Sequence, residues 1–258
     1  MIISAGDSFV FGSELQSINN TFTALLGADE CIAWPGYAND SISRTTIERC
    51  EQGGVSGVIV LWTFPGRYEF RFNYDTEQKK SPWYAINSWT IKSDIDSIKN
   101  EFVNDDPKIL YLQKQTIERA NYTGVADFAD VFYKHVGGTE YWEIYSSLKE
   151  IIYLQNYLTV KGIPFMFTCA DNSILYNYTI LNADSIISSL VNQLDNSKWF
   201  WFPAGINPQD TQHPRGFYQW AVENKYPIGT THPLEEAHQD AANLIQEKFN
   251  EMVKKSIQ

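Results

Sequence analysis

Short apolar runs alternate along the chain with segments whose apolar positions recur at helical spacing. The runs predict five strands, at residues 2–5, 31–34, 57–63, 164–169 and 199–202. The third run is apolar at nearly every position, as is typical of a strand covered on both of its faces. We therefore expect this strand to lie at the centre of a sheet.

Two helices are predicted between the strands, at residues 41–51 and 141–160, and a third after the last strand, in the stretch that follows Pro233. Gly162 ends the second, and proline suits the first position of the third because its missing N–H has no helical partner there. Strands that alternate with helices are typical of βαβ units. The pattern predicts an α/β fold, a three-layer α/β/α sandwich with a mostly parallel five-stranded sheet.

Two long segments interrupt this alternation, at about residues 64–139 and 171–196. No internal repeat or Pro/Gly/Ser-rich linker marks a second domain, so we expect a single domain, residues 1–258, with two insertions. The first insertion is rich in Trp and Tyr. These rings could stack on sugars, although packing the insertion onto the domain is the preferred interpretation.

Composition excludes several classes of protein. The 20 Lys and Arg against 31 Asp and Glu give a net charge of −11, which argues against a nucleic-acid partner. Three cysteines without a CxxC spacing argue against a disulfide framework and a structural zinc site. The four histidines form no HExxH motif and no glycine-rich phosphate loop is present, so we expect neither a metal nor a cofactor.

The start of the chain lacks the features of a signal peptide, and no apolar run approaches the roughly 18 residues of a membrane span. These observations predict a cytoplasmic protein with no membrane span. The high aromatic and Asn content also suits a phage-encoded protein, which would place it in the virion or the host cytosol.

The segment Gly6-Asp7-Ser8 directly follows the first predicted strand. In open α/β sheets, ligands bind beyond the carboxyl ends of the strands, so Ser8 lies where a nucleophile or a ligand-binding hydroxyl belongs. Gly, Asp and Ser are also the ordinary residues of a strand-to-helix turn. Ser8 is therefore a candidate nucleophile only if a general base lies elsewhere in the chain.

His232 supplies a candidate partner at the other end of the chain, where His232-Pro233 opens the last predicted helix. An imidazole exchanges a proton near neutral pH and can act as a general base. The alternative is a helix-capping or surface histidine.

Together the two ends resemble the GDSL, or SGNH, hydrolase family. Its nucleophilic serine lies in a Gly-Asp-Ser turn after the first strand, and its histidine precedes the last helix. Residues 33–39 look like the family's glycine block, and residues 61–63 lie where its asparagine block lies. The resemblance implies a flavodoxin-like α/β/α fold and an oxyanion hole made from the N–H groups of Ser8 and Gly36 and one side-chain donor.

The sequence departs from that family at the side-chain donor. No asparagine follows the third strand, where Trp62-Thr63-Phe64 stands instead. Thr63 or Asn39 could supply the donor, and Thr63 is preferred.

The second departure concerns the acid that orients the histidine. The family places Asp three residues before its histidine, and Gly229 stands there in this chain. Either Ser8 and His232 act as a dyad, or a carboxylate comes from elsewhere. Asp210-Thr-Gln-His213-Pro214 has the full family spacing, so His213 is an alternative base and Asp210 a candidate acid for either histidine. His232 is preferred because it begins the terminal amphipathic helix.

Four further residues are candidates for contacting substrate or for fixing a loop. Arg67 and Glu69 follow the third strand, Asn39 follows the second and Glu14 follows the first. An ion pair that fixes a loop is the simpler interpretation of the first two. The sequence thus predicts a serine esterase acting on a small-molecule or glycan ester, for example a carbohydrate acetyl ester. The alternative is a binding or structural module that kept the fold and lost the chemistry.

Overall fold

The computed structural model of the chain describes residues 1–72, 83–91, 124–176, 184–204 and 213–254. It divides into two compact units. The sheet unit comprises Met1–Pro65 and Ile144–Gln258, and the second unit comprises Gly66–Glu143. Both predicted catalytic side chains belong to the sheet unit.

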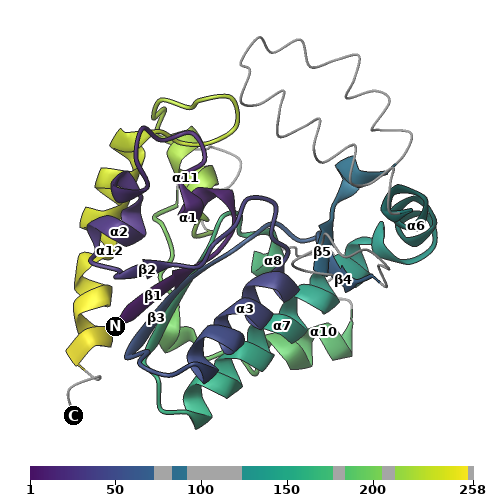
Figure 1. Cartoon of the computed structure of the whole chain (residues 1–258), viewed down its shortest axis with the longest axis horizontal. Coiled ribbons are helices and arrows are strands. Elements are labelled where there is room, and N and C mark those ends of the chain that lie inside the picture. Colours follow the sequence, from purple (N-terminus) through teal and green to yellow (C-terminus); the bar gives the residue numbers. More distant parts are fainter. Residues whose placement is uncertain (73–82, 92–123, 177–183, 205–212, 255–258) are drawn as a thin grey trace. The chain divides into compact units, whose positions relative to one another are not determined.

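The sheet unit contains a four-stranded parallel sheet in the order β2-β1-β3-β6 (Figure 1). Its strands are β1 (Ile2–Ala5), β2 (Glu30–Cys31), β3 (Gly57–Trp62) and β6 (Phe165–Cys169). Strand β3 is buried throughout and pairs with β1 on one side and β6 on the other. The predicted α/β class and the central position of this strand are confirmed.

The prediction of five strands is wrong among the described residues, since the fifth run makes only isolated bridges. Phe200 N–H donates to the carbonyl of Phe167 over 2.8 Å, next to a parallel bridge between Phe167 and Trp199. Two residues later, Phe202 pairs with Arg215 instead. The run therefore leaves β6 before a ladder can form.

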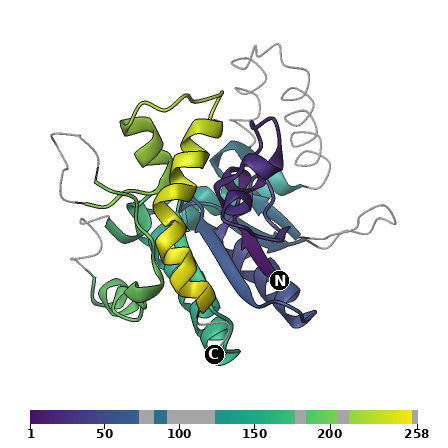
Figure 2. The ribbon, with the colours of Figure 1, turned by 90° about the vertical axis from the view of Figure 1, so that its left-hand side faces the viewer.

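Helices cover both faces of the sheet (Figures 1 and 2). On one face lie α2 (Phe22–Leu25) and α12 (Glu235–Lys254), and on the other α3 (Asn39–Glu51) and the part of α7 (Glu140–Val160) that belongs to this unit. Ile59 and Leu61 share a core with Ala241 and Ile245 of α12. Because side chains alternate along a strand, the neighbouring residues of β3 face α3 and α7.

Shorter helices complete the sheet unit: α1 (Ser8–Phe11), η1 (Ile18–Asn20), α8 (Ser173–Tyr176), α10 (Ser185–Val191), η4 (Asn196–Lys198) and α11 (Phe217–Glu223). Helices α1 and α11 lie at the end of the sheet opposite the N-terminus (Figure 1). This is the carboxyl end of β1, where ligands of open α/β sheets bind.

One of the four histidines is part of this core. His238 of α12 is 1% exposed, and its Nδ1 accepts a hydrogen bond from Phe22 N–H over 3.1 Å. Burial lowers the pKa of His238 to about 4, so the ring is neutral at pH 7 and packs as a core side chain.

The second unit has its own small core. Strand β4 (Tyr68–Arg71) pairs antiparallel with β5 (Trp83–Ile86), and η2 (Ser88–Thr90), α6 (Val125–Phe132) and a π-helical turn, η3 (Tyr133–Gly137), follow. Tyr68 and Ile86 are buried against α6, and the phenol of Tyr68 donates to the carbonyl of Gly137. Most described rings of this unit therefore pack against one another.

Across all described ranges, no helix is both long and apolar enough to cross a membrane.

Candidate active site

Ser8 is the first residue of α1, at the carboxyl end of β1. Asp7 caps this helix, since its Oδ1 accepts the N–H of Phe9 over 3.1 Å. Gly6 is required before it, because a Cβ there would overlap Val10 and crowd the carbonyl of Leu61. The tight turn thus packs against β3 and presents the Ser8 side chain beyond the edge of the sheet.

His232 lies in the loop between α11 and α12, within a tight turn. The N–H of Gly229 donates to the carbonyl of His232 over 2.8 Å, and Ile228 forms an antiparallel bridge with Pro233. The imidazole packs against Phe9, with 4.8 Å between ring centroids. These contacts fix the ring beside α1.

The structure brings Ser8 and His232 together and adds the carboxylate of Glu14, whose contact with the histidine the sequence did not predict. Ser8 Oγ lies 2.7 Å from His232 Nε2. On the other side of the ring, Glu14 Oε1 lies 2.7 Å from His232 Nδ1. The serine, the imidazole and the carboxylate therefore form a continuous hydrogen-bonded chain.

Glu14 is held by several donors besides His232. Its carboxylate accepts the backbone N–H groups of Thr230 and Thr231 and the hydroxyl of Thr231. Burial by itself would raise the pKa of the Glu14 carboxyl, but the hydrogen bonds from His232 and Thr231 outweigh burial and hold that pKa below its ordinary value. The group is therefore ionised at neutral pH.

An ionised Glu14 determines which ring nitrogen of His232 carries the proton. A carboxylate only accepts hydrogen bonds, so Nδ1 must donate to it. In the neutral imidazole Nε2 is then the acceptor, and the Ser8 hydroxyl donates to it. This arrangement can take the proton from Ser8 as its oxygen attacks an electrophile.

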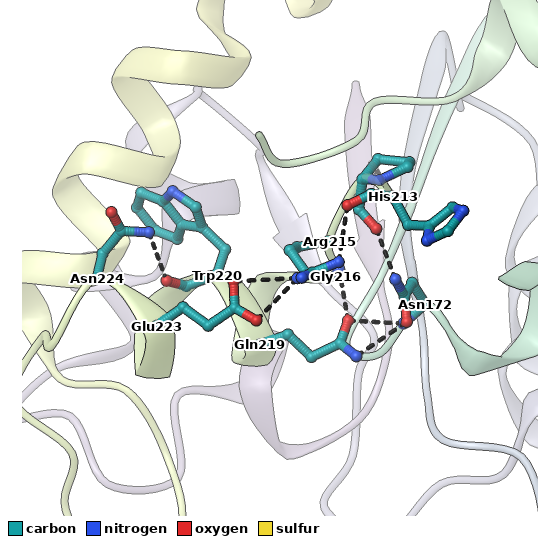
Figure 3. Close-up of polar contacts among 9 residues, drawn as sticks. Asn172, His213, Arg215, Gly216, Gln219, Trp220, Glu223 and Asn224 are labelled. Carbon is teal, nitrogen blue, oxygen red and sulfur yellow. Dashed lines mark hydrogen bonds and ion pairs between the residues drawn. The ribbon is translucent and has the colours of Figure 1, made fainter. Parts of the chain in front are cut away.

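The alternative base, His213, belongs to a different network (Figure 3). Its carbonyl accepts a hydrogen bond from the guanidinium of Arg215, which also pairs with Glu223. The His213 imidazole points away from that ion pair (Figure 3). Asp210 lies outside the described residues. Of the two histidines weighed as the base, His232 is the one hydrogen-bonded to Ser8.

Gly36 lies in the loop between β2 and α3, and a hydrogen bond joins this loop to the serine turn. The N–H of Trp34 donates to the carbonyl of Gly6 over 3.4 Å. Ser8 is the first residue of α1, so its own N–H is one of those with no acceptor inside the helix. Both predicted backbone donors therefore lie on segments that meet at this edge of the sheet.

The structure corrects the expected role of Thr63. The Thr63 side chain is fully buried, and its hydroxyl donates to Asp7 Oδ2 over 2.5 Å. A hydroxyl has only one hydrogen to donate. Thr63 therefore stabilises the cap of α1 and is not an oxyanion donor.

Asn39 is corrected in the same way, both as a third donor and as a substrate-binding residue. The side chain is 2% exposed, and its amide donates to the carbonyl of Thr63 and to Ser147 Oγ. Its Oδ1 accepts the N–H of Thr63 over 3.0 Å. Asn39 therefore fixes the end of β3 to α3 and α7.

We expect Thr63→Val to lower the free energy of unfolding by about 1–3 kcal/mol, because the buried Asp7 carboxylate loses a donor. Chemical denaturation of this variant and of Thr63→Ser, which keeps the hydroxyl, measures the effect. A Thr63→Val protein of wild-type stability with a much lower kcat would instead support an oxyanion role for this hydroxyl.

The remaining candidates, Arg67 and Glu69, belong to the second unit, where Arg67 precedes β4 and Glu69 lies within it. Their proposed contact with substrate stays a prediction. Within the described ranges, no group of three or more His, Cys, Asp or Glu side chains is arranged to hold a metal ion.

Comparisons with known proteins identify one solved structure. No family model matches the chain, and no curated protein matches it. A crystal structure of the psychrotrophic esterase EstA from Pseudoalteromonas sp., inhibited by monoethylphosphonate, aligns over 99% of this chain and 97% of that chain. The TM-score is 0.43 and the sequence identity is 11%.

Proposed function

We propose that this protein is a serine esterase of the SGNH type that hydrolyses short O-acyl esters. The observation that carries the proposal is the Ser8–His232 hydrogen bond of 2.7 Å at the carboxyl edge of the sheet. It joins a potential nucleophile to a base whose other nitrogen is held by a carboxylate, which is the arrangement needed to activate a hydroxyl.

In the first half of the reaction, Ser8 Oγ attacks the acyl carbonyl carbon, and its proton moves to His232 Nε2. The carbonyl π electrons move onto the oxygen, which becomes an oxyanion. When the intermediate collapses, the bond to the leaving alcohol breaks and Nε2 returns the proton to that alcohol. In the second half, water takes the place of Ser8 as nucleophile, and the same transfers release the acid and restore the Ser8 hydroxyl.

The oxyanion requires hydrogen-bond donors, and we assign this role to the backbone N–H groups of Ser8 and Gly36. Such donors stabilise charge that develops only as the serine attacks. Because the side chains of Thr63 and Asn39 hold other groups, the proposed hole has two backbone donors and no side-chain donor from these positions.

An exposed aromatic side chain suggests the kind of alcohol that the ester carries. Trp34, on the loop that contains Gly36, is 58% exposed and packs edge-on against Phe11, with ring centroids 5.4 Å apart. A flat, exposed indole suits stacking on a sugar ring, and the net charge of −11 disfavours polyanions. We therefore favour an acetyl ester of a neutral carbohydrate as substrate.

Reaction with a fluorophosphonate probe tests the proposed function without knowledge of the natural substrate. We expect stoichiometric labelling of wild-type protein at Ser8, located by peptide mass spectrometry, and no labelling of Ser8→Ala. The matched control is Ser13→Ala, which removes an exposed serine hydroxyl from the turn that follows α1. A folded wild-type protein that stays unlabelled would favour the alternative, a non-catalytic binding module.

A further inference from the structure

We propose that Glu14, from the loop after α1, is the positioning residue for His232 and that its carboxylate occupies the space that a side chain at position 229 would fill. This inference rests on the proposed function, because it names the acid that orients the proposed base. It assigns that role to a residue 218 positions before the histidine.

The contacts of Glu14 are those of a side chain that is fixed in place. The Glu14 and His232 side chains are each only 16% exposed. Oε1 faces Nδ1 of the ring at 2.7 Å, and the two oxygens together accept the N–H groups of Thr230 and Thr231. The backbone just before His232 thus holds the carboxylate that orients the His232 ring.

A second contact fixes the same loop to α12. Gln16 lies two residues after Glu14, and its N–H donates to Glu235 Oε1 of α12 over 2.8 Å. The loop between α1 and η1 is therefore held both to the turn that carries His232 and to the helix that follows it. This anchoring keeps the Glu14 carboxylate at the ring without a side chain from the turn itself.

The geometry at Gly229 shows that the two positions compete for one space. A Cβ added to Gly229 would overlap Glu14 Oε2, and it would lie 3.1 Å from Glu14 Cδ and 3.3 Å from Leu234. Gly229 is not one of the glycines with a positive φ, so its backbone accepts an L-residue. Glu14 is therefore the principal obstacle to a side chain at position 229.

This competition predicts that the carboxylate can be moved from one position to the other. The hydrogen bond from Gly229 N–H to the carbonyl of His232 places the two residues across one turn. When Glu14 is shortened to alanine, an aspartate at position 229 would extend into the vacated space beside Nδ1. Asparagine at the same position has the same shape and no charge, which makes it the matched control.

The experiment compares Glu14→Gln, Glu14→Ala and the double variants Glu14→Ala/Gly229→Asp and Glu14→Ala/Gly229→Asn in hydrolysis of p-nitrophenyl acetate. We expect Glu14→Gln to lower kcat by about 10²–10⁴-fold with little change in KM, because an amide favours the wrong tautomer of the ring. We expect the kcat of Glu14→Ala/Gly229→Asp to be at least tenfold higher than that of Glu14→Ala and that of Glu14→Ala/Gly229→Asn.

Proton NMR supplies a readout that does not depend on hydrolysis. A ring N–H that donates to a carboxylate gives a resonance far downfield of the amide protons. We expect this signal in the spectrum of Ser8→Ala. It should be lost in Ser8→Ala/Glu14→Gln and should return in the triple variant Ser8→Ala/Glu14→Ala/Gly229→Asp. This readout also separates the two proposals: a signal that depends on Glu14 in a protein that neither hydrolyses esters nor reacts with the probe would sustain the positioning role and overturn the esterase.

Two results would overturn the inference. One is a wild-type kcat for Glu14→Gln together with a downfield signal in Ser8→Ala/Glu14→Gln that is unchanged from that of Ser8→Ala. The other is an Asp double variant that is no more active than the Asn double variant. Glu14→Gln still tests the inference if Glu14→Ala does not fold. The amide oxygen of the introduced glutamine can accept the N–H groups of Thr230 and Thr231, so the loop should keep its structure.

Discussion

Ser8→Ala should lower kcat/KM for p-nitrophenyl acetate by at least about 10³-fold, because it removes the proposed nucleophile. The fold should survive, since Asp7 and not Ser8 caps α1 and the Ser8 side chain bonds only to His232 among the contacts described. Initial rates measure the first effect and chemical denaturation measures the second.

The interpretation of this variant depends on its control. Ser13→Ala should hydrolyse the ester at close to the wild-type rate. Activity of Ser8→Ala above about a tenth of wild type would remove Ser8 from the mechanism and leave its hydrogen bond to His232 as a structural contact.

The fold class could be predicted because apolar periodicity reports burial directly. The run at Gly57–Trp62 is apolar on both faces, and the structure places it between two parallel neighbours with helices on either side. The count of strands could not be read in the same way. Apolar character at residues 199–202 reports that Trp199 and Phe202 are buried, and burial does not require a ladder of hydrogen bonds.

The juxtaposition of Ser8 and His232 was foreseeable from topology. A residue after β1 and a residue before the last helix can meet at one edge of a parallel sheet, whatever their separation in sequence. The position of Glu14 on the loop after the first strand makes it a candidate for contacting substrate or fixing a loop, but no motif in that loop predicts its contact with His232. That the acid comes from elsewhere is indicated only by Gly229, which stands where the resemblance expects an acid.

For Thr63 and Asn39 the sequence predicts a polar side chain at the right place but the wrong role, that of an oxyanion donor. Each has a polar side chain near the carboxyl edge of the sheet, which is why the sequence indicates each as an oxyanion donor. The structure shows that their hydrogen bonds hold Asp7 and the end of β3. Sequence identifies a donor, but only the surrounding acceptors decide whether its hydrogen is available to a substrate.

His232→Ala should be as damaging as Ser8→Ala, with a loss of at least about 10³-fold in kcat, because the serine then has no base to take its proton. The double variant Ser8→Ala/His232→Ala should be no slower than either single variant. Residues that act as one unit lose their joint contribution only once. Steady-state kinetics of the four proteins in this cycle measure the coupling.

His213→Ala is the matched control, since it removes the other histidine that the sequence pairs with proline. We expect its kcat to stay within a few-fold of wild type, because the contact that the structure gives His213 with Arg215 uses its backbone carbonyl, which alanine retains. The reverse ranking of the two histidines would mean that the segment around His213 approaches Ser8 during catalysis. Full additivity of the losses at Ser8 and His232 would mean that their hydrogen bond of 2.7 Å takes no part in proton transfer.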